Sequence, residues 1–401
     1  MKKILGVLIV ILCSAYTFSN PTYDEKLPSR KYHAHRSALK NSFLKFSTEK
    51  KGRVVFLGGS ITHNPGWRDS VCNYLTQKFP ETEFDFINAG IPSMGSTPGA
   101  FRFERDVLKN GPVDLLFEEA AVNDDTNGRT PKEIIRGMEG IVRHALTANP
   151  ACDIVLMYFA DPGKTEHYHA QEIPAEIALH DSVAKHYNIP AINLAKEVAE
   201  RIDAGEFSWE NDFKDLHPSP FGQNIYFQSI RFFLEEEWKT SSQAEKMPEK
   251  EIPSPIDKYS YSNGKLVEPN PRKSFKGWEM IDNWYPQDGK ETRPNYVNVP
   301  ILEGSYPGKT IKFHFKGNAV GIAVAAGPDA GIIEYSVDNH PWKKQDLYTP
   351  WSNFLHLPWY YTLESGLQNR NHTLQIRVSE NKNSESRGNV CRIRYFFFNA
   401  E

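Results

Sequence analysis

The stretch that decides the fold is Val54-Val55-Phe56-Leu57-Gly58-Gly59-Ser60-Ile61-Thr62, written VVFLGGSIT. Its apolar run is typical of a buried strand, and the two glycines allow a sharp backbone turn where the strand ends. A serine at that point lies at the carboxyl edge of a sheet, where open α/β folds bind their ligands. Ser60 is therefore a candidate nucleophile, although a helix N-cap is the commoner role of such a serine.

Apolar strand patterns and helical patterns alternate after this stretch. Further strands are expected at 83–90, 113–120, 153–160 and 190–194, and helices at 67–79, 131–148, 175–186 and 224–239. Near-continuous apolar strands between helices are typical of a parallel sheet that is covered on both faces. The sequence therefore predicts an α/β domain.

The texture changes after this domain. Residues 239–264 are polar and rich in Pro and Ser, which is typical of a linker. Beyond them, short runs at 311–315, 319–326, 331–338, 372–379 and 391–399 predict an antiparallel β-sandwich. The predicted domain limits are a signal peptide at 1–19, a hydrolase-type α/β domain at 20–240, a linker at 241–264 and a jelly-roll-like accessory sandwich at 265–401.

The N-terminus has the pattern of a secretory signal. Two lysines after Met1 precede a short apolar run at 4–12, and a cut near Ala15 or Ser19 is expected. Leu12 occupies the position before Cys13 where a lipoprotein signal has a small residue, so simple export is favoured over a lipid anchor at Cys13. The mature protein is expected to be secreted or periplasmic, with no integral membrane segment. The formal net charge of -3 gives no reason to expect a nucleic-acid partner.

Three cysteines remain after removal of the signal: Cys72, Cys152 and Cys391. An odd number leaves at least one thiol free or paired between chains. No two of them have metal-ligand spacing, so buried thiols are expected.

Three further positions at strand ends suit the chemistry of a serine nucleophile, which needs a base and donors for an oxyanion. Gly90 ends the second strand with a bare backbone N–H, and Asn123 follows the third with an amide. His217 lies in the loop Asp215–Gln223, DLHPSPFGQ, after the fifth strand. Alone, each is more simply a turn glycine, a helix cap or a surface histidine, but their conjunction with Ser60 favours a catalytic site.

The blocks GGSIT, NAGIPS, AAVND and DLHPSPFGQ together resemble the four blocks of the SGNH hydrolases, also called GDSL-type esterases, over residues 52–233. The resemblance implies a flavodoxin-like three-layer α/β/α fold with a five-stranded parallel sheet. It also implies a serine hydrolase without metal or organic cofactor. Ser60 would be the nucleophile and His217 the base. The backbone N–H groups of Ser60 and Gly90 and the side chain of Asn123 would form the oxyanion hole.

The sequence departs from the family pattern at three positions. Gly59 replaces the acid before the serine, and Ala121 replaces the glycine of the third block. The position of the triad aspartate, three residues before the histidine, is Lys214. Asp215 is the predicted orienter of His217, and the alternative is a Ser–His dyad.

The substrate prediction depends on the second half of the chain. EYSVD at 334–338 and the strand entry at 366–374 resemble β-sandwich modules of secreted polysaccharide-deacetylating esterases. Aromatic faces that stack on sugars are expected among Trp351, Phe354, Trp359, Tyr360 and Tyr361, for which core and inter-domain packing is the alternative.

Two residues just past the nucleophile, Trp67 and Arg68, are predicted to bind substrate. The chain is thus predicted to be an exported esterase that removes O-acetyl groups from a polysaccharide or oligosaccharide. The alternatives are a lipid or aryl esterase, an O-acyltransferase on a cell-envelope polymer, or a polysaccharide-binding protein with an inactive catalytic domain.

Overall fold

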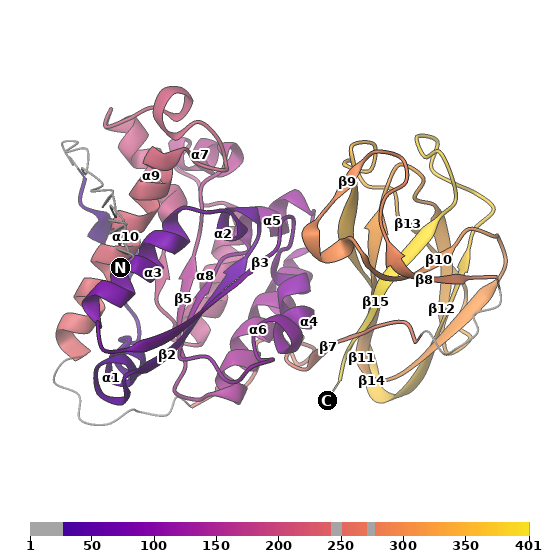
Figure 1. Cartoon of the computed structure of the whole chain (residues 1–401), viewed down its shortest axis with the longest axis horizontal. Coiled ribbons are helices and arrows are strands. Elements are labelled where there is room, and N and C mark those ends of the chain that lie inside the picture. The colour runs from indigo at the N-terminus through magenta and orange to yellow at the C-terminus, as the bar shows by residue number, and fades with distance from the viewer. Residues whose placement is uncertain (1–26, 242–250, 271–276, 401) are drawn as a thin grey trace, which may run out of the picture.

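The computed structural model describes residues 27–241, 251–270 and 277–400, and Figure 1 shows them as two domains joined side by side. The predicted signal peptide at 1–19 lies outside the described residues. Within the described ranges, no helix is both long and apolar enough to cross a membrane.

The first domain is built around a six-stranded sheet with the order β1-β6-β5-β4-β2-β3. Its strands are β1 (His33–Ala34), β2 (Lys51–Gly58), β3 (Glu83–Gly90), β4 (Leu115–Glu118), β5 (Asp153–Met157) and β6 (Ala191–Ile192). Strands β2 to β6 are parallel, as predicted. The expectation of five strands is corrected by β1, which pairs antiparallel with β6 at one edge. Two residues carry no readable period, so the sequence pattern could not indicate this strand.

Helices cover both faces of this sheet, which confirms the three-layer α/β/α prediction. They are α1 (Lys40–Leu44), α2 (Ser60–His63), α3 (Trp67–Lys78), α4 (Ser96–Asp106), α5 (Ala121–Thr126), α6 (Pro131–Ala148), α7 (Pro162–His169), α8 (Ala175–His186), α9 (Leu194–Asp203) and α10 (Pro220–Ser241). Helices α1, α3 and α10 pack together on one face, and α4, α6 and α8 on the other.

Helix α6 shows why the sequence predicted these elements well. Pro131 occupies its first turn, and Thr130 and Glu133 form a capping box that satisfies backbone N–H groups at the helix start. The apolar positions at helical spacing, Ile134, Met138, Ile141, Val142 and Ala145, are all buried. Burial of this stripe, more than helix propensity, stabilises the helix.

The second domain is an antiparallel β-sandwich, as predicted. Its strands are β7 (Gly264–Val267), β8 (Glu279–Trp284), β9 (Glu291–Thr292), β10 (Val299–Gly304), β11 (Thr310–Ala326), β12 (Ile332–Val337), β13 (Lys343–Asp346), β14 (Leu355–Val378) and β15 (Cys391–Asn399). Among the described strand pairs of this domain, only the short β9–β14 pair is parallel, beside two isolated parallel bridges.

Two predicted strands, 311–315 and 319–326, are one strand in the structure, β11. The register shifts between Gly317 and Ala319, and a side chain at Gly317 would lie 2.1 Å from the Asn399 carbonyl oxygen. The glycine thus marks a bulge within a continuous strand and not a chain reversal.

One apolar cluster runs from the first domain into the second, and the second domain has another cluster of its own. The ring of Phe101 on α4 lies 4.4 Å, centroid to centroid, from that of Phe397 on β15. The described part of the predicted linker also packs on α6: the backbone N–H of Asp257 donates to the buried Glu139 carboxylate at 3.0 Å, and the Asp257 side chain pairs with Arg136 at 2.8 Å. This continuous packing predicts a fixed arrangement of the domains. The exact domain limits stay a prediction.

The cysteines are free thiols in the described residues. Cys152 and Cys391 are buried, and Cys72 is partly buried. Burial raises the pKa of the Cys72 thiol to about 12, so this thiol is unreactive near neutral pH.

Candidate active site

Ser60 lies where β2 gives way to α2, at the carboxyl edge of the sheet. Gly58 ends the strand, and Ser60 is the first residue of the helix. The first N–H groups of a helix have no intrahelical partner, so the backbone N–H of Ser60 is free to bind a ligand. A side chain at Gly59 would lie 1.9 Å from Oδ1 of Asn123, which explains why glycine stands where the family pattern has an acid.

His217 reaches Ser60 from a distant loop. Its Nε2 lies 2.7 Å from Ser60 Oγ, a hydrogen-bond distance. A π-helical turn at Trp209–Phe213 precedes the loop, and Lys214 follows it with φ of 79°, a left-handed conformation that is costly for lysine. The chain therefore turns sharply just before the histidine.

Asp215 lies near His217 but is held loosely. Its Oδ1 is 3.8 Å from His217 Nδ1, beyond hydrogen-bond distance, and it accepts the backbone N–H of His217 at 3.1 Å. The Asp215 side chain is 61% exposed. Asp212 is turned away, because its carboxylate accepts the backbone N–H and the hydroxyl of Ser208. The geometry is closer to a Ser–His dyad with a nearby acid than to a hydrogen-bonded triad.

Asn123 lies beside the nucleophile in the first turn of α5. Its Oδ1 faces Gly59. Its Nδ2 has no hydrogen-bond partner among the described residues. The next residue, Asp124, is fully buried and accepts the Ser96 N–H at 2.8 Å and a bond from His180 Nε2 at 2.9 Å. These bonds fix α5 against α4 and α8, and so hold Asn123 in place.

The structure contradicts the predicted oxyanion role of Gly90. Its backbone N–H donates to the Asn88 side chain at 3.0 Å and is not free. A side chain at Gly90 would lie 2.5 Å from the backbone nitrogen of His63. Glycine is needed at position 90 because β3 and α2 approach closely here. A glycine at a strand end can therefore mark close packing as well as an exposed backbone N–H, and the sequence does not distinguish the two.

Ser93, three residues further on, has the features that were expected of Gly90. It has φ of 70°, which is uncommon outside glycine, asparagine and aspartate, and its backbone N–H has no partner among the described residues. The Asn127 side chain holds its carbonyl at 3.1 Å. Met94, the next residue, places its carbonyl oxygen against Gly59. The sequence contained no signal for Ser93, because a left-handed serine cannot be distinguished from any other serine.

The substrate-binding prediction for Trp67 is wrong. Its side chain is 0% exposed, and the indole lies among Phe56, Phe117 and Phe159. A fully buried ring cannot contact a sugar. Its Nε1–H instead donates to the Ile61 carbonyl at 3.2 Å, which fixes the turn after Ser60.

Arg68 also supports this turn. Its Nε–H donates to the Thr62 carbonyl at 3.1 Å, its Nη1 pairs with Asp69 at 2.9 Å, and the side chain is 16% exposed. Within the described part of the chain, no contact directs the guanidinium toward Ser60, so its role in substrate binding stays a prediction.

Two arginines connect the site to the second domain, and the sequence analysis did not predict either contact. Arg293, between β9 and β10, donates through Nη2 to Ser93 Oγ at 3.3 Å. Arg129, just after α5, donates to the Tyr360 carbonyl at 3.0 Å in the opposite direction. Burial lowers the pKa of Arg293, and no acid pairs with it within the described residues. The segment that carries Ser93 is thus braced by the other domain.

The predicted aromatic cluster divides between the two expected roles. Tyr360 is buried and stacks on Phe397 at 5.5 Å in the shared core. Trp351 and Phe354 are 41% and 66% exposed.

The fold and these contacts define a class of protein before any comparison. A serine at the carboxyl edge of a parallel sheet, bonded to a histidine from a later loop, is the pattern of a serine hydrolase. The turn also lacks the second glycine of a G-x-S-x-G elbow, which separates it from the α/β-hydrolases.

One family model matches the first domain. Residues 56–225 match the model of the GDSL-like lipase/acylhydrolases, and the chain is a carboxylic ester hydrolase. No curated protein matches the chain.

Solved structures match both domains at once. A two-domain esterase (CEX) active on acetylated mannans, co-crystallized with mannopentaose, is 20% identical with a TM-score of 0.74, over 94% of this chain and 99% of that chain. A second structure of a two-domain esterase (CEX) active on acetylated mannans is also 20% identical, with a TM-score of 0.72, over 92% of this chain and 98% of that chain. At this identity the likeness shows the two-domain fold.

Proposed function

We propose that the protein is an exported esterase that removes O-acetyl groups from a polysaccharide of the mannan type, with Ser60 as nucleophile. The observation that carries the proposal is the 2.7 Å contact between His217 Nε2 and Ser60 Oγ. A serine hydroxyl is a weak nucleophile at neutral pH, and a neutral imidazole at this distance is the base that it needs.

The reaction proceeds in two halves. His217 takes the proton of Ser60 as Oγ attacks the acetyl carbonyl, and the tetrahedral intermediate collapses as the imidazolium returns that proton to the departing sugar oxygen. The sugar hydroxyl leaves, and the acetyl group stays on Ser60. His217 then takes a proton from water, which attacks the acetyl-enzyme. Acetate and free Ser60 result.

The developing oxyanion is stabilised by three donors. These are the backbone N–H groups of Ser60 and Ser93 and the Nδ2 of Asn123, each without a partner in the described residues. Ser93 replaces Gly90 in this proposal because the Gly90 N–H is bound to Asn88. A preorganised donor of this kind accounts for about 10²–10³ of the rate.

The substrate class rests on two observations. The similar two-domain structures are of esterases active on acetylated mannans, and one was co-crystallized with mannopentaose. The second domain also contacts the segment at Ser93 through Arg293 and exposes the rings of Trp351 and Phe354, which suit sugar stacking.

The test is acetate release by the full chain from acetylated glucomannan, xylan and pectin, with Ser60→Ala as control. We expect Ser60-dependent release that is fastest from glucomannan. Release from a long-chain acyl ester but from no polysaccharide would favour a lipid esterase instead. Transfer of acetyl from a donor ester to added mannan, without net release of acetate, would favour the acyltransferase alternative.

A further inference from the structure

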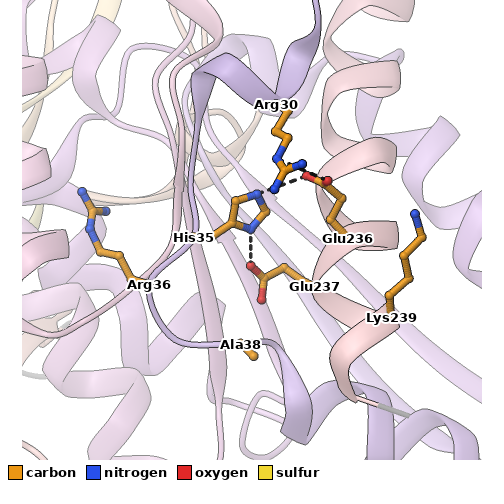
Figure 2. Close-up of a pocket in the computed structure, with 7 residues that line it drawn as sticks. All are labelled: Arg30, His35, Arg36, Ala38, Glu236, Glu237 and Lys239. Atoms are coloured by element: carbon orange, nitrogen blue, oxygen red, sulfur yellow. Dashed lines mark hydrogen bonds and ion pairs between the residues drawn. The ribbon is translucent and has the colours of Figure 1, made fainter.

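His35 lies between two carboxylates of α10, at the edge of the first domain (Figure 2). Its Nδ1 is 2.5 Å from Glu237 Oε1, and its Nε2 is 3.2 Å from Glu236 Oε2. Glu237 is 4% exposed, and its other oxygen accepts the Leu39 backbone N–H at 3.0 Å. The fixed Glu237 carboxylate therefore accepts a hydrogen bond from Nδ1–H of His35, and the opposite nitrogen, Nε2, faces Glu236.

His33, two residues earlier on the same segment, has a lone pair without a partner. Its Nε2 lies 2.9 Å from Ser229 Oγ, and the Ser229 hydroxyl donates its own hydrogen to Glu197 at 2.5 Å. The Ser229 oxygen therefore accepts from His33 Nε2–H, which leaves Nδ1 unprotonated. This Nδ1 is buried and has no hydrogen-bond partner among the residues that the structure describes.

Together these side chains form a ligand set. One ligand atom from each of His33, His35 and Glu236 lies within 4.8 Å of the other two, and no other such group of three occurs in the described residues. Two imidazoles and a carboxylate are ligands that Zn²⁺ accepts. Bonds of 2.0–2.1 Å in a tetrahedron place neighbouring ligand atoms about 3.3 Å apart, close to the 3.2 Å between His35 and Glu236.

The neighbouring groups favour this reading of the cluster. A carboxylate that holds the far nitrogen of a ligating histidine, as Glu237 holds His35, is the usual outer partner in zinc sites. Arg30 lies 3.6 Å from Glu236, but its side chain is 72% exposed and can move into water. Arg36 and Lys239 point away from His35 in Figure 2.

We propose that His33, His35 and Glu236 bind a Zn²⁺ ion that joins the N-terminal segment to α10, with Glu237 as the positioning residue of His35. The ion takes the place of a proton between His35 Nε2 and Glu236, and water completes the fourth position. The role is structural. Strand β1 pairs over only two residues, so a metal tether would add to the stability of its attachment to the domain. Glu236 lies about 24 Å along α10 from Pro220, which is close to the loop that carries His217, so the ion would be remote from the catalytic residues.

The test is calorimetric titration of the chelator-treated full chain with ZnCl₂, together with its thermal unfolding. We expect one ion per chain with micromolar or tighter affinity, and a rise in Tm of several degrees. His33→Ala and Glu236→Gln should each weaken binding at least tenfold and abolish the rise in Tm.

A matched control is available in the same domain. His169 and Asp203 form an exposed pair at 2.7 Å that belongs to no group of three ligand side chains in the described residues, so His169→Ala should leave Zn²⁺ binding unchanged. Glu236→Gln keeps the side-chain volume and decides the question if His33→Ala fails to fold. The proposal is overturned if the wild type shows no saturable binding, or if folded Glu236→Gln binds Zn²⁺ as tightly as the wild type.

Discussion

Asp215→Asn tests how His217 is oriented. A triad aspartate that is hydrogen-bonded to the imidazole contributes about 10⁴ to kcat. Here the nearest carboxylate oxygen is 3.8 Å from Nδ1, and the side chain is 61% exposed. No other acid approaches Nδ1 among the described residues.

The expected magnitude follows from this geometry. Two unit charges 3.8 Å apart in a water-like dielectric interact by about 1 kcal/mol. Loss of the Asp215 charge should therefore weaken stabilisation of the imidazolium by that amount, which lowers kcat about sixfold. Added salt should reduce the effect further, because the pair is open to solvent.

The assay is the initial rate of p-nitrophenyl acetate hydrolysis at pH 8, for wild type, Asp215→Asn, Asp212→Asn and His217→Ala. We expect a three- to tenfold loss for Asp215→Asn and a loss of at least 10³ for His217→Ala. The Asp212 variant controls for the Ser208 contacts of the preceding turn. A loss of 10³ or more in Asp215→Asn would refute the reasoning, because it would require a hydrogen bond to Nδ1 in the working enzyme.

Three further changes test other parts of the site. Gly59→Ala should lower kcat about 100-fold, because its Cβ would lie 1.9 Å from Asn123 Oδ1 and displace an oxyanion donor. Gly163→Ala is the control, because its Cβ would meet nothing closer than 3.4 Å. Equal rates in the two variants would contradict the role of Asn123. Arg293→Ala should lower kcat/KM about tenfold, because it removes the hydrogen bond that holds the Ser93 segment. Arg387→Ala, at an exposed arginine of the same domain, should leave kcat/KM unchanged. An unchanged kcat/KM in Arg293→Ala would show that the Arg293–Ser93 contact has no effect on catalysis. Burial raises the pKa of Glu119 from 4.5 to about 7, so the folded state favours the protonated acid and loses about 3 kcal/mol of stability as pH rises from 4.5 to above 7. Urea unfolding at pH 5 and pH 8 should show Glu119→Gln to be less sensitive to pH than the wild type, and equal sensitivity would contradict this.

The sequence predicted those features that leave a periodic or local pattern. Alternation of apolar strands with capped helices was sufficient for the parallel sheet, and the strand ends led to Ser60, Asn123 and His217. The structure brings Ser60 and His217 together across 157 residues of sequence. Their roles stay predictions until activity is measured.

Other features depend on contacts between distant segments and have no such pattern. Trp67 is an exception, because it stands at helical spacing with the buried Val71 and Leu75, and that pattern indicated a buried ring. Gly90 and Ser93 differ in hydrogen bonding, which a sequence does not display. Arg293 and the group of His33, His35 and Glu236 come from separate elements, so no spacing rule could associate them with a site.

The most direct test of the central claim is detection of the acyl-enzyme. The full chain is mixed with p-nitrophenyl acetate, quenched in acid within milliseconds, digested and analysed by mass spectrometry. We predict a single acetyl group on the peptide that contains Ser60, and none in Ser60→Ala, which also releases no acetate. Undiminished acetate release by folded Ser60→Ala would contradict the role of Ser60 as the nucleophile.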